Sequence, residues 1–293
     1  LGILMVKSHQ IVITGASGFV ARNLRKYLSE KNIKLISISR NDFKQFKNEL
    51  KIVSKNYDEK SLLPKIQNSD AIIHLVGTGK QSINTDYNVV NVEFTKHIVN
   101  LSKKAKISKF VFTSGLGVSA NTSSGYFISK HKAERLIVNS GLNYTIFRPS
   151  YIVGKDDLFT KYLKKQIKKG KIEIPGSGTY SIQPIHINDV VKILLQSVLQ
   201  TKFKNKIIDL VGPDCITFEQ YVKLFSKGTK TSIKKINLED VYHTAITNTK
   251  SDFGVDDLNI LIGSFKGNYN KLRKITEMKF QSVIELLKSG RLL

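Results

Sequence analysis

The chain of 293 residues contains no tryptophan, one cysteine, two methionines and five prolines. The single cysteine, Cys215, excludes an intrachain disulfide and a cysteine-based metal site. This usage fits a reducing compartment, so we expect a cytoplasmic protein. No apolar stretch reaches about 18 residues, and we expect no transmembrane segment. The initial LGILMV is too short for a secretory signal, and we expect the natural start to be Met5.

Acidic residues are also scarce, since 47 lysines and arginines stand against 23 aspartates and glutamates, a net charge of +24. Such an excess is typical of proteins that bind nucleic acid, anionic lipid or another acidic partner, but also of surfaces that are simply well solvated. The lysines are spread along the chain and are densest over 161–171. No module of interleaved aromatic and basic residues accompanies them. We therefore do not expect a nucleic-acid partner, and we keep a peripheral position at a membrane as an alternative.

The first half of the chain alternates apolar runs with amphipathic helical runs. The apolar runs predict strands over 9–15, 34–40, 70–77, 109–115 and 144–150, and a further strand over 205–212. The helical patterns lie over 19–31, 58–69, 87–106 and 125–141. Continuous apolar strands that alternate with helices predict an α/β fold, a doubly wound parallel (Rossmann) sheet covered on both faces.

Beyond Pro149 the alternation loosens, and helices over 158–170 and 186–200 are followed by a tail rich in lysine, asparagine and aspartate. We predict a Rossmann core over 5–150 that is completed by about 185–212. Residues 151–184 and 213–293 are predicted to form a smaller, mostly helical, substrate-side lobe. The spacing of histidines and acids suits no metal site, and we predict none.

A glycine-rich turn interrupts the first predicted strand in IVITGASGFVA. Gly15 permits a tight turn, Gly18 lets the backbone approach a ligand, and Ala21 allows close packing of helix on strand. The N-terminus of the following helix offers free N–H groups to phosphate. Although a plain tight turn can have the same pattern, the strand-turn-helix context predicts a dinucleotide site here.

The end of the second strand, SISRND, bears on which dinucleotide binds. An acid at this place would take the ribose hydroxyls of NAD, but Ser39 and Arg40 stand there instead. Because a guanidinium can pair with a 2′-phosphate through two hydrogen bonds, we predict NADP rather than NAD. Asp42 is close enough in sequence to compete for the ribose.

Tyr126 and Lys130 share one helical face in GYFISKHKAE, shortly after the strand that ends in FTSG. A lysine in this position can hold a ribose and lower the phenol pKa through its charge. The tyrosine can then exchange a proton with a substrate hydroxyl or carbonyl.

Seven segments of this chain, in this order, resemble the extended or atypical short-chain dehydrogenase/reductase superfamily, in its NAD(P)-dependent epimerase/dehydratase-like branch. They are TGASGFVA, SDAIIHLVG, NVEFTKHIVNLSKKAKISKFVFTSGLG, YFISK, RPSYIVG, QPIHINDVV and DLVGPDCIT, between residues 9 and 225. TSGLG and VGPDCITFEQY are most similar to the atypical group that includes the complex I 39-kDa accessory subunit.

The resemblance implies roles for specific residues. It places the pyrophosphate at Gly15, Ala16, Ser17, Gly18, Phe19 and Val20, and the adenosine ribose phosphate at Ser39 and Arg40. Further cofactor contacts are implied at Leu75, Val76, Gly77, Thr113, Pro149, Ser150 and Tyr151. Tyr126 and Lys130 would be the catalytic pair, with Ser114 orienting the reacting oxygen.

One departure affects the predicted chemistry. The serine or threonine of the family aligns with Gly115, so Ser114 or, failing it, Thr113 has to supply the hydroxyl. The resemblance implies a small-molecule substrate, by default a nucleotide-sugar whose diphosphate the lysines of 161–171 would meet, and a homodimer through the helix of the Tyr-Lys pair. The alternative is a weakly or non-catalytic NADP(H)-binding accessory protein, acting in an assembly or at a membrane surface.

Overall fold

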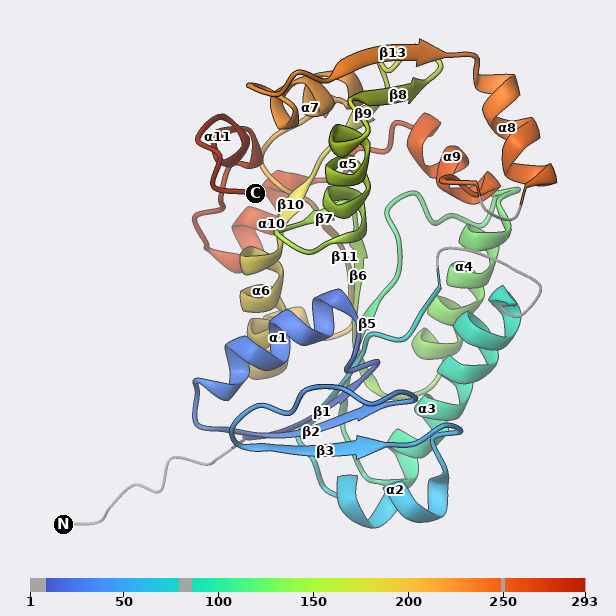
Figure 1. Cartoon of the computed structure of the whole chain (residues 1–293). Helices are drawn as coiled ribbons and strands as arrows, with labels where there is room; N and C mark the ends of the chain where they lie inside the picture. Colours follow the sequence, from blue (N-terminus) through green and yellow to red (C-terminus); the bar gives the residue numbers. More distant parts are fainter. Residues whose placement is uncertain (1–8, 79–85, 249–250, 293) are drawn as a thin grey trace.

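The computed structural model describes residues 9–78, 86–248 and 251–292. Its centre is a seven-stranded sheet in the order β11-β6-β5-β4-β1-β2-β3, in which every neighbouring pair is parallel (Figure 1). The strands are β1 (His9–Thr14), β2 (Ile33–Ser39), β3 (Glu49–Val53), β4 (Ala71–His74), β5 (Lys109–Thr113), β6 (Asn143–Pro149) and β11 (Lys206–Leu210). The predicted α/β fold with a doubly wound parallel sheet is therefore confirmed.

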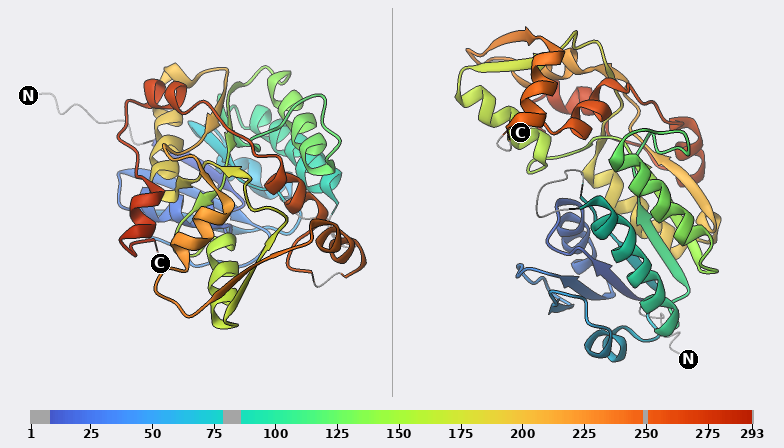
Figure 2. Two further views of the ribbon diagram at one scale, coloured as in Figure 1. Left: turned by 90° about the horizontal axis from the view of Figure 1, so that it is seen from above. Right: turned by 90° about the vertical axis from the view of Figure 1, so that its right-hand side faces the viewer.

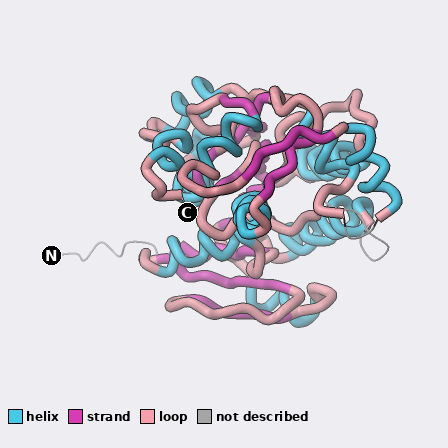
Figure 3. The backbone as a smooth tube through the Cα atoms, turned by 45° about the horizontal axis from the view of Figure 1, so that its top comes forward, coloured by secondary structure: helices cyan, strands magenta, loops and turns pink. Residues whose placement is uncertain are grey.

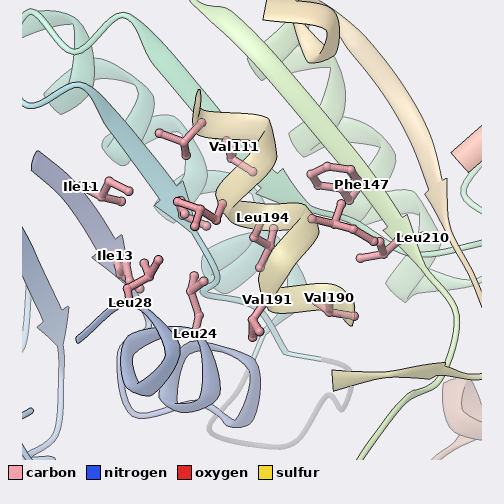
Figure 4. Packing of buried hydrophobic residues seen from close by; sticks show 14 of the residues in the cluster. Ile11, Ile13, Leu24, Leu28, Val111, Phe147, Val190, Val191, Leu194 and Leu210 are labelled. Atoms are coloured by element: carbon pink, nitrogen blue, oxygen red, sulfur yellow. The ribbon is translucent and has the colours of Figure 1, made fainter. Parts of the chain in front are cut away.

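Helices cover both faces of this sheet because its strands are apolar on both sides. One face packs against α1 (Phe19–Ser29) and α6 (Ile187–Leu199), whose Leu24, Leu28 and Leu194 meet strand residues such as Ile13 and Phe147 (Figure 4). On the other face lie α2 (Glu59–Ile66), α3 (Phe94–Lys104) and α4 (Gly125–Val138). Leu272 of α10 (Tyr269–Thr276) joins the first of these two cores.

The remaining elements form a second body beside the sheet. They are α5 (Leu158–Lys168), β8 (Lys171–Pro175), α7 (Phe218–Phe225), β13 (Ser232–Ile236), α8 (Leu238–Thr247), α9 (Val255–Ile262) and α11 (Val283–Lys288). Short pairings join β7 (Ile152–Val153) to β10 (Ile185–His186) and β9 (Ser181–Ile182) to β12 (Ile216–Thr217). A third apolar core lies among these segments. The right-hand view of Figure 2 shows this body above the sheet, and Figure 3 shows strands crossing it with helices around them. The predicted boundaries of core and lobe remain a proposal.

The strand β3 is absent from the sequence-based prediction. It lies at the edge of the sheet, and Leu50 and Val53 are 47% and 49% exposed. Only Glu49 and Ile52 of its five residues are buried. An edge strand with so little buried apolar surface leaves no clear periodic pattern in the sequence.

The predicted helix over 87–106 begins differently from an ordinary α-helix. Residues Asn88–Glu93 form a π-helical segment, η1, before α3 continues. Within the described residues, every helix is too short or too polar to cross a membrane. The expected start at Met5 lies outside the described residues.

Candidate functional site

The chain reverses the direction in which it adds strands between β1 and β4, which is where open α/β sheets bind ligands. Gly15 follows β1 and Leu75 follows β4. Gly15 has φ +76°, and a Cβ there would lie 3.0 Å from backbone atoms of Leu75 and Val76. The close approach of these two loops therefore requires glycine at position 15.

The helix α1 begins at this switch point with its N-terminus free. Gly18 is the N-cap residue, no side chain caps it, and its N–H bonds Gly15 O at 2.9 Å. No acidic residue lies in the first turn, so Phe19 and Val20 present backbone N–H groups next to a glycine turn. Such an uncapped helix start suits a phosphate group.

Two residues that sequence reasoning missed hold the glycine-rich turn in place. The Tyr57 hydroxyl accepts from Gly15 N at 3.1 Å and donates to Ile38 O at 2.9 Å. Arg25, 1% exposed, donates to Ala16 O at 2.8 Å and pairs with Glu49 at 2.5 and 2.8 Å. Ala16 itself is fully buried, so it contributes only backbone. No motif in the sequence marks either residue.

The end of β2 lies beside the turn, as the sequence predicted. The hydroxyls of Ser17 and Ser39 are 2.9 Å apart, and Arg40 is exposed. Asp42 forms an ion pair with Lys51, and the hydrogen bond from Lys51 holds the pKa of Asp42 below its usual value. Asp42 is thus already engaged by a cation, whereas Arg40 is directed at solvent.

Tyr126 and Lys130 share a cavity of about 200 Å³ with the loops that follow β4 and β5. The other residues that line it are Leu75, Val76, Gly77, Thr78, Thr113 and Ser114. Lys130 is 5% exposed and donates from Nζ to Thr113 O at 3.2 Å. A Cβ at Gly77 would lie 2.8 Å from Lys130 Nζ, so the glycine makes room for the ammonium group.

The sequence leads us to expect that Lys130 lowers the pKa of Tyr126, but the pKa of Tyr126 lies above its ordinary value. Burial, followed by the charges of Asp256 and Asp257, raises the pKa of Tyr126 to about 12. Burial lowers the pKa of Lys130 to about 8, against the opposing charge of Glu134. Desolvation is therefore the main influence on the pKa of the phenol. The phenol is a proton donor over the whole neutral range.

Ser114 supplies a hydroxyl in the cavity that contains Tyr126. Ser114 is 4% exposed, and its Oγ is buried without a hydrogen-bond partner among the residues that the structure describes. Since a buried, unpaired hydroxyl carries a desolvation cost, it is suited to bond a ligand oxygen. At Gly115 a Cβ would lie 3.1 Å from Tyr126 Oη, so the absence of a side chain there gives the phenol its room.

Tyr126 also forms part of the wall of a second cavity, of about 170 Å³. Pro149, Ser150 and Tyr151 line this one, together with Gly115, Leu116, Phe127, Ser181, Ile182, Ile260 and Phe265. The predicted residues Pro149, Ser150 and Tyr151 thus line one cavity and those at the ends of β4 and β5 line the other, while Tyr126 lines both.

Asn91 is a further polar group near the lysine that sequence reasoning missed. It is 1% exposed and sits in η1, and its amide bonds both Thr78 backbone groups at 3.0 and 3.1 Å and Ser129 Oγ at 3.0 Å. Its Oδ1 would lie 3.3 Å from a Cβ at Gly77. Asn91 therefore fixes the loop that borders the cavity, and the π-helical turn, a feature often found at functional sites, places it there. The only signal in the sequence was a polar residue within an apolar helical run.

A model of the NAD dependent epimerase/dehydratase family matches residues 11–210. Among solved structures, a nucleoside-diphosphate-sugar epimerase from Staphylococcus aureus is similar, with a TM-score of 0.76, 17% identity, and coverage of 95% of this chain and 99% of that one. A UDP-glucuronic acid 4-epimerase from Bacillus cereus, in complex with UDP-glucuronic acid and NAD, has a TM-score of 0.75, 17% identity and coverage of 96% of each chain. At this identity the likeness concerns the fold.

Curated relatives include NADH dehydrogenase [ubiquinone] 1 alpha subcomplex subunit 9, mitochondrial. The Dictyostelium discoideum protein is 25% identical over 237 residues, 77% of this chain and 65% of that protein. The mouse protein is 26% identical over 178 residues, 60% and 47% of the two chains. The chain thus spans about half to two thirds of the length of these relatives. Together these matches confirm the resemblance stated from the sequence.

Proposed function

Because this chain belongs to the NAD dependent epimerase/dehydratase family, we propose that it is an NAD(P)-dependent oxidoreductase or epimerase-type enzyme. In this proposal a hydride moves between a nicotinamide and a substrate carbon, and Tyr126 exchanges a proton with the substrate oxygen. The observation that carries the proposal is the position of Tyr126. It is the one residue shared by the cavity of Lys130 and Ser114 and by the cavity of Pro149 and Tyr151.

Each cavity has a role in this proposal. The 200 Å³ cavity adjoins the switch point of the sheet and takes the nicotinamide ribose, which Lys130 would hold. The 170 Å³ cavity takes the substrate. The reacting oxygen lies where the two cavities meet at Tyr126, so that Ser114 bonds it from the wall of the 200 Å³ cavity. Tyr126 gives this oxygen a proton in reduction, because burial keeps the phenol protonated. The cofactor, when bound, supplies or accepts the hydride.

We propose NADP as the preferred cofactor. The uncapped start of α1 and the close loops at Gly15 leave backbone groups for a pyrophosphate, which both dinucleotides have. The exposed Arg40 is free to meet a 2′-phosphate, while Asp42 is paired with Lys51. The structural neighbours named above include a complex with NAD, so NAD is the competing cofactor.

Cofactor binding tests the first half of this proposal. NADPH and NADH are titrated into protein stripped of nucleotide, and the fluorescence of the reduced nicotinamide is the signal. The chain has no tryptophan that would contribute background fluorescence. Arg40→Ala is expected to weaken NADPH about tenfold to hundredfold and to leave NADH unchanged. Lys47→Ala removes another exposed cation from the same loop and should change neither affinity. Equal affinities for the two cofactors in the unaltered protein would contradict the role of Arg40.

Turnover tests the second half. Tyr126→Phe should abolish hydride transfer to any substrate found, with NADPH affinity changed less than about threefold, because only the proton is lost. Tyr144→Phe is the matched control, since Tyr144 lies in β6 near the end of the sheet opposite the site. Full activity in Tyr126→Phe would contradict the assignment.

The curated relatives favour a second candidate, a weakly or non-catalytic NADP(H)-binding accessory protein in an assembly or at a membrane surface. The missing side chain at Gly115 is consistent with it. The exchange rate of bound NADPH separates a reductase from the accessory protein. A reductase exchanges its cofactor in every catalytic cycle, whereas a structural cofactor stays bound through gel filtration and is released only on unfolding. An epimerase returns the hydride within one cycle and keeps its cofactor, so turnover of substrate by the protein with bound cofactor identifies it.

A further inference from the structure

The cavity beside Tyr126 that we assign to the substrate is small and apolar. Its side chains come from the start of α4, from the loops after β5 and β6, from β9, and from the segment around α9. Leu116, Phe127, Ile182, Ile260 and Phe265 form most of the wall, and Ser150 and Ser181 are its aliphatic hydroxyls. Among the described residues that line it, none carries a charge.

The volume indicates the size of the chemical group that fits inside the cavity. It measures about 170 Å³, and a cavity of about 150 Å³ lined by aliphatic and aromatic side chains accommodates one benzene ring. A single six-membered ring with one or two substituents therefore fills it. A nucleotide-sugar, with its base, ribose, diphosphate and hexose, is several times larger.

The charges near the cavity also bear on the ligand. A diphosphate in a confined site needs cations or free N–H groups to replace its water. The charges that raise the pKa of Tyr126 are the carboxylates of Asp256 and Asp257, and Ser124 at the start of α4 donates to Asp256 at 2.6 Å. The cation near the Tyr126 ring is Lys130, whose Nζ lies 6.0 Å from the ring centre, but it lines the neighbouring cavity. The lysines of α5, which the sequence suggested for a diphosphate, do not line the cavity, and Lys165 pairs with Asp252 at 3.4 Å.

Phe265 brings an aromatic ring to the wall of the cavity. Its ring packs edge-to-face on Phe127 at 5.2 Å, and it occupies the space over Gly117, where a Cβ would lie 2.7 Å from the ring. A Cβ at Gly263 would lie 2.3 Å from the same ring. The two glycines thus leave the space that this apolar part of the wall occupies.

We propose that the substrate is a compact, uncharged and largely apolar carbonyl compound, or the matching alcohol, the size of one six-membered ring. This inference rests on the proposed function of the site. In reduction the carbonyl carbon receives a hydride from NADPH, which becomes NADP⁺, and the carbonyl oxygen takes the Tyr126 proton. The phenolate is then reprotonated from solvent. In oxidation each transfer is reversed.

The test uses a pair of aldehydes matched in shape but not in charge, benzaldehyde and 4-carboxybenzaldehyde, with UDP-glucose and UDP-glucuronic acid as the large anionic alternative. Oxidation or formation of NADPH and direct calorimetric binding to the NADP⁺-loaded protein are both measured. The unaltered protein should prefer benzaldehyde over its carboxylate by at least about tenfold in kcat/KM, and it should bind benzaldehyde at least about tenfold more tightly than either UDP-sugar.

Two variants of α9 test whether this cavity is the source of the preference for the uncharged aldehyde. Ile260 lines the cavity and is only partly buried, so Ile260→Arg places a guanidinium there. It should reverse the preference toward 4-carboxybenzaldehyde while NADPH affinity stays within about twofold. Ile262→Arg adds the same charge to the same helix at a residue that does not line the cavity, and should leave the preference unchanged.

Three results would contradict either the proposed function or the proposed substrate class, and they can be told apart. Failure to bind NADPH or NADH overturns the proposed function itself. If the protein binds the cofactor, and binds or converts a UDP-sugar but not benzaldehyde, the proposed substrate class is wrong. The proposed reaction class is then unaffected. Cofactor binding without binding of either kind of compound also overturns the substrate class.

Discussion

At the scale of single residues, burial changes the chemistry of the groups around Tyr126. The phenol is held protonated, the ammonium of Lys130 titrates near neutrality, and the Ser114 hydroxyl lacks a partner within the described part of the chain. Perturbed groups that converge on one cavity are typical of functional sites. The sequence identified all three as candidates, but their burial comes from the packing around them.

Variants of Ser114 and Gly115 test which residue supplies the hydroxyl that orients the substrate. Ser114→Ala should lower kcat at least about tenfold without loss of stability, because a buried unpaired hydroxyl is removed. Gly115→Ser should also lower kcat, since its Cβ would crowd Tyr126 Oη at 3.1 Å. Steady-state kinetics and thermal unfolding measure both. A gain of activity in Gly115→Ser would show that the missing serine, rather than Ser114, limits the reaction.

The titration of Lys130 predicts a pH dependence. Because its pKa is lowered to about 8, the ammonium charge is present below that pH and lost above it. We expect reductive kcat/KM to be level from about pH 6 to 7.5 and to fall about tenfold per unit above pH 8, while Tyr126 stays protonated to about pH 12. Lys130→Arg, whose guanidinium does not titrate in this range, should remove the fall. An unchanged profile in that variant would assign the fall to another group.

At the scale of elements, the turn between β1 and α1 depends on a close approach as well as on a backbone angle. Gly15 and Gly141 both have positive φ, +76° and +80°, but only Gly15 has neighbours within 4 Å. Gly141→Ala should cost ~1 kcal/mol in unfolding free energy through its φ alone. Gly15→Ala should cost at least about twice as much and weaken NADPH at least about tenfold. Equal losses of unfolding free energy in the two variants, measured by denaturant unfolding, would show that the loops after β1 and β4 move apart freely.

A buried ion pair connects α1, β3 and the glycine-rich turn. Burial alone would raise the pKa of Glu49, but hydrogen bonds led by the one from Arg25 bring it below its usual value. Arg25→Met leaves this carboxylate buried without its cation and should cost ~3–5 kcal/mol in unfolding free energy at neutral pH. The double variant with Glu49→Leu should recover most of the loss. A double variant as unstable as the single one would mean that the packing of Arg25 on Phe43 and Phe46 is the main contribution.

At the scale of the whole molecule, the positive charge bears on self-association. The homodimer implied by the family resemblance would pair the groove between α3 and α4 with its copy. Apart from Glu93, the charged or titratable side chains that line this groove are Lys96, Lys103, His131, Lys132 and Arg135. Two such faces repel each other at low ionic strength, so a dimer through this face has to be strengthened by salt.

Sedimentation velocity at about 50 mM and 500 mM sodium chloride checks this expectation. The protein should be monomeric at the lower concentration and associate at the higher one. Lys132→Glu in the groove should favour the dimer at low salt, whereas Lys161→Glu on α5 should not. A dimer that is stable at low salt and dissociates at high salt would exclude this face as the interface.

The sequence by itself determined the sheet, its parallel alternation with helices, the glycine-rich turn and the Tyr-Lys pair, because each rests on local periodicity or on spacing within one element. Tertiary structure decided what required distant segments to meet. Tyr57 holds the turn from the loop between β3 and α2, and Arg25 of α1 pairs with Glu49 of β3. Asp256 reaches the start of α4 across 132 residues, and β3 pairs only at an edge. The acidity of Tyr126 belongs to this second group, since desolvation is a property of the packed molecule and has no signature in the order of residues.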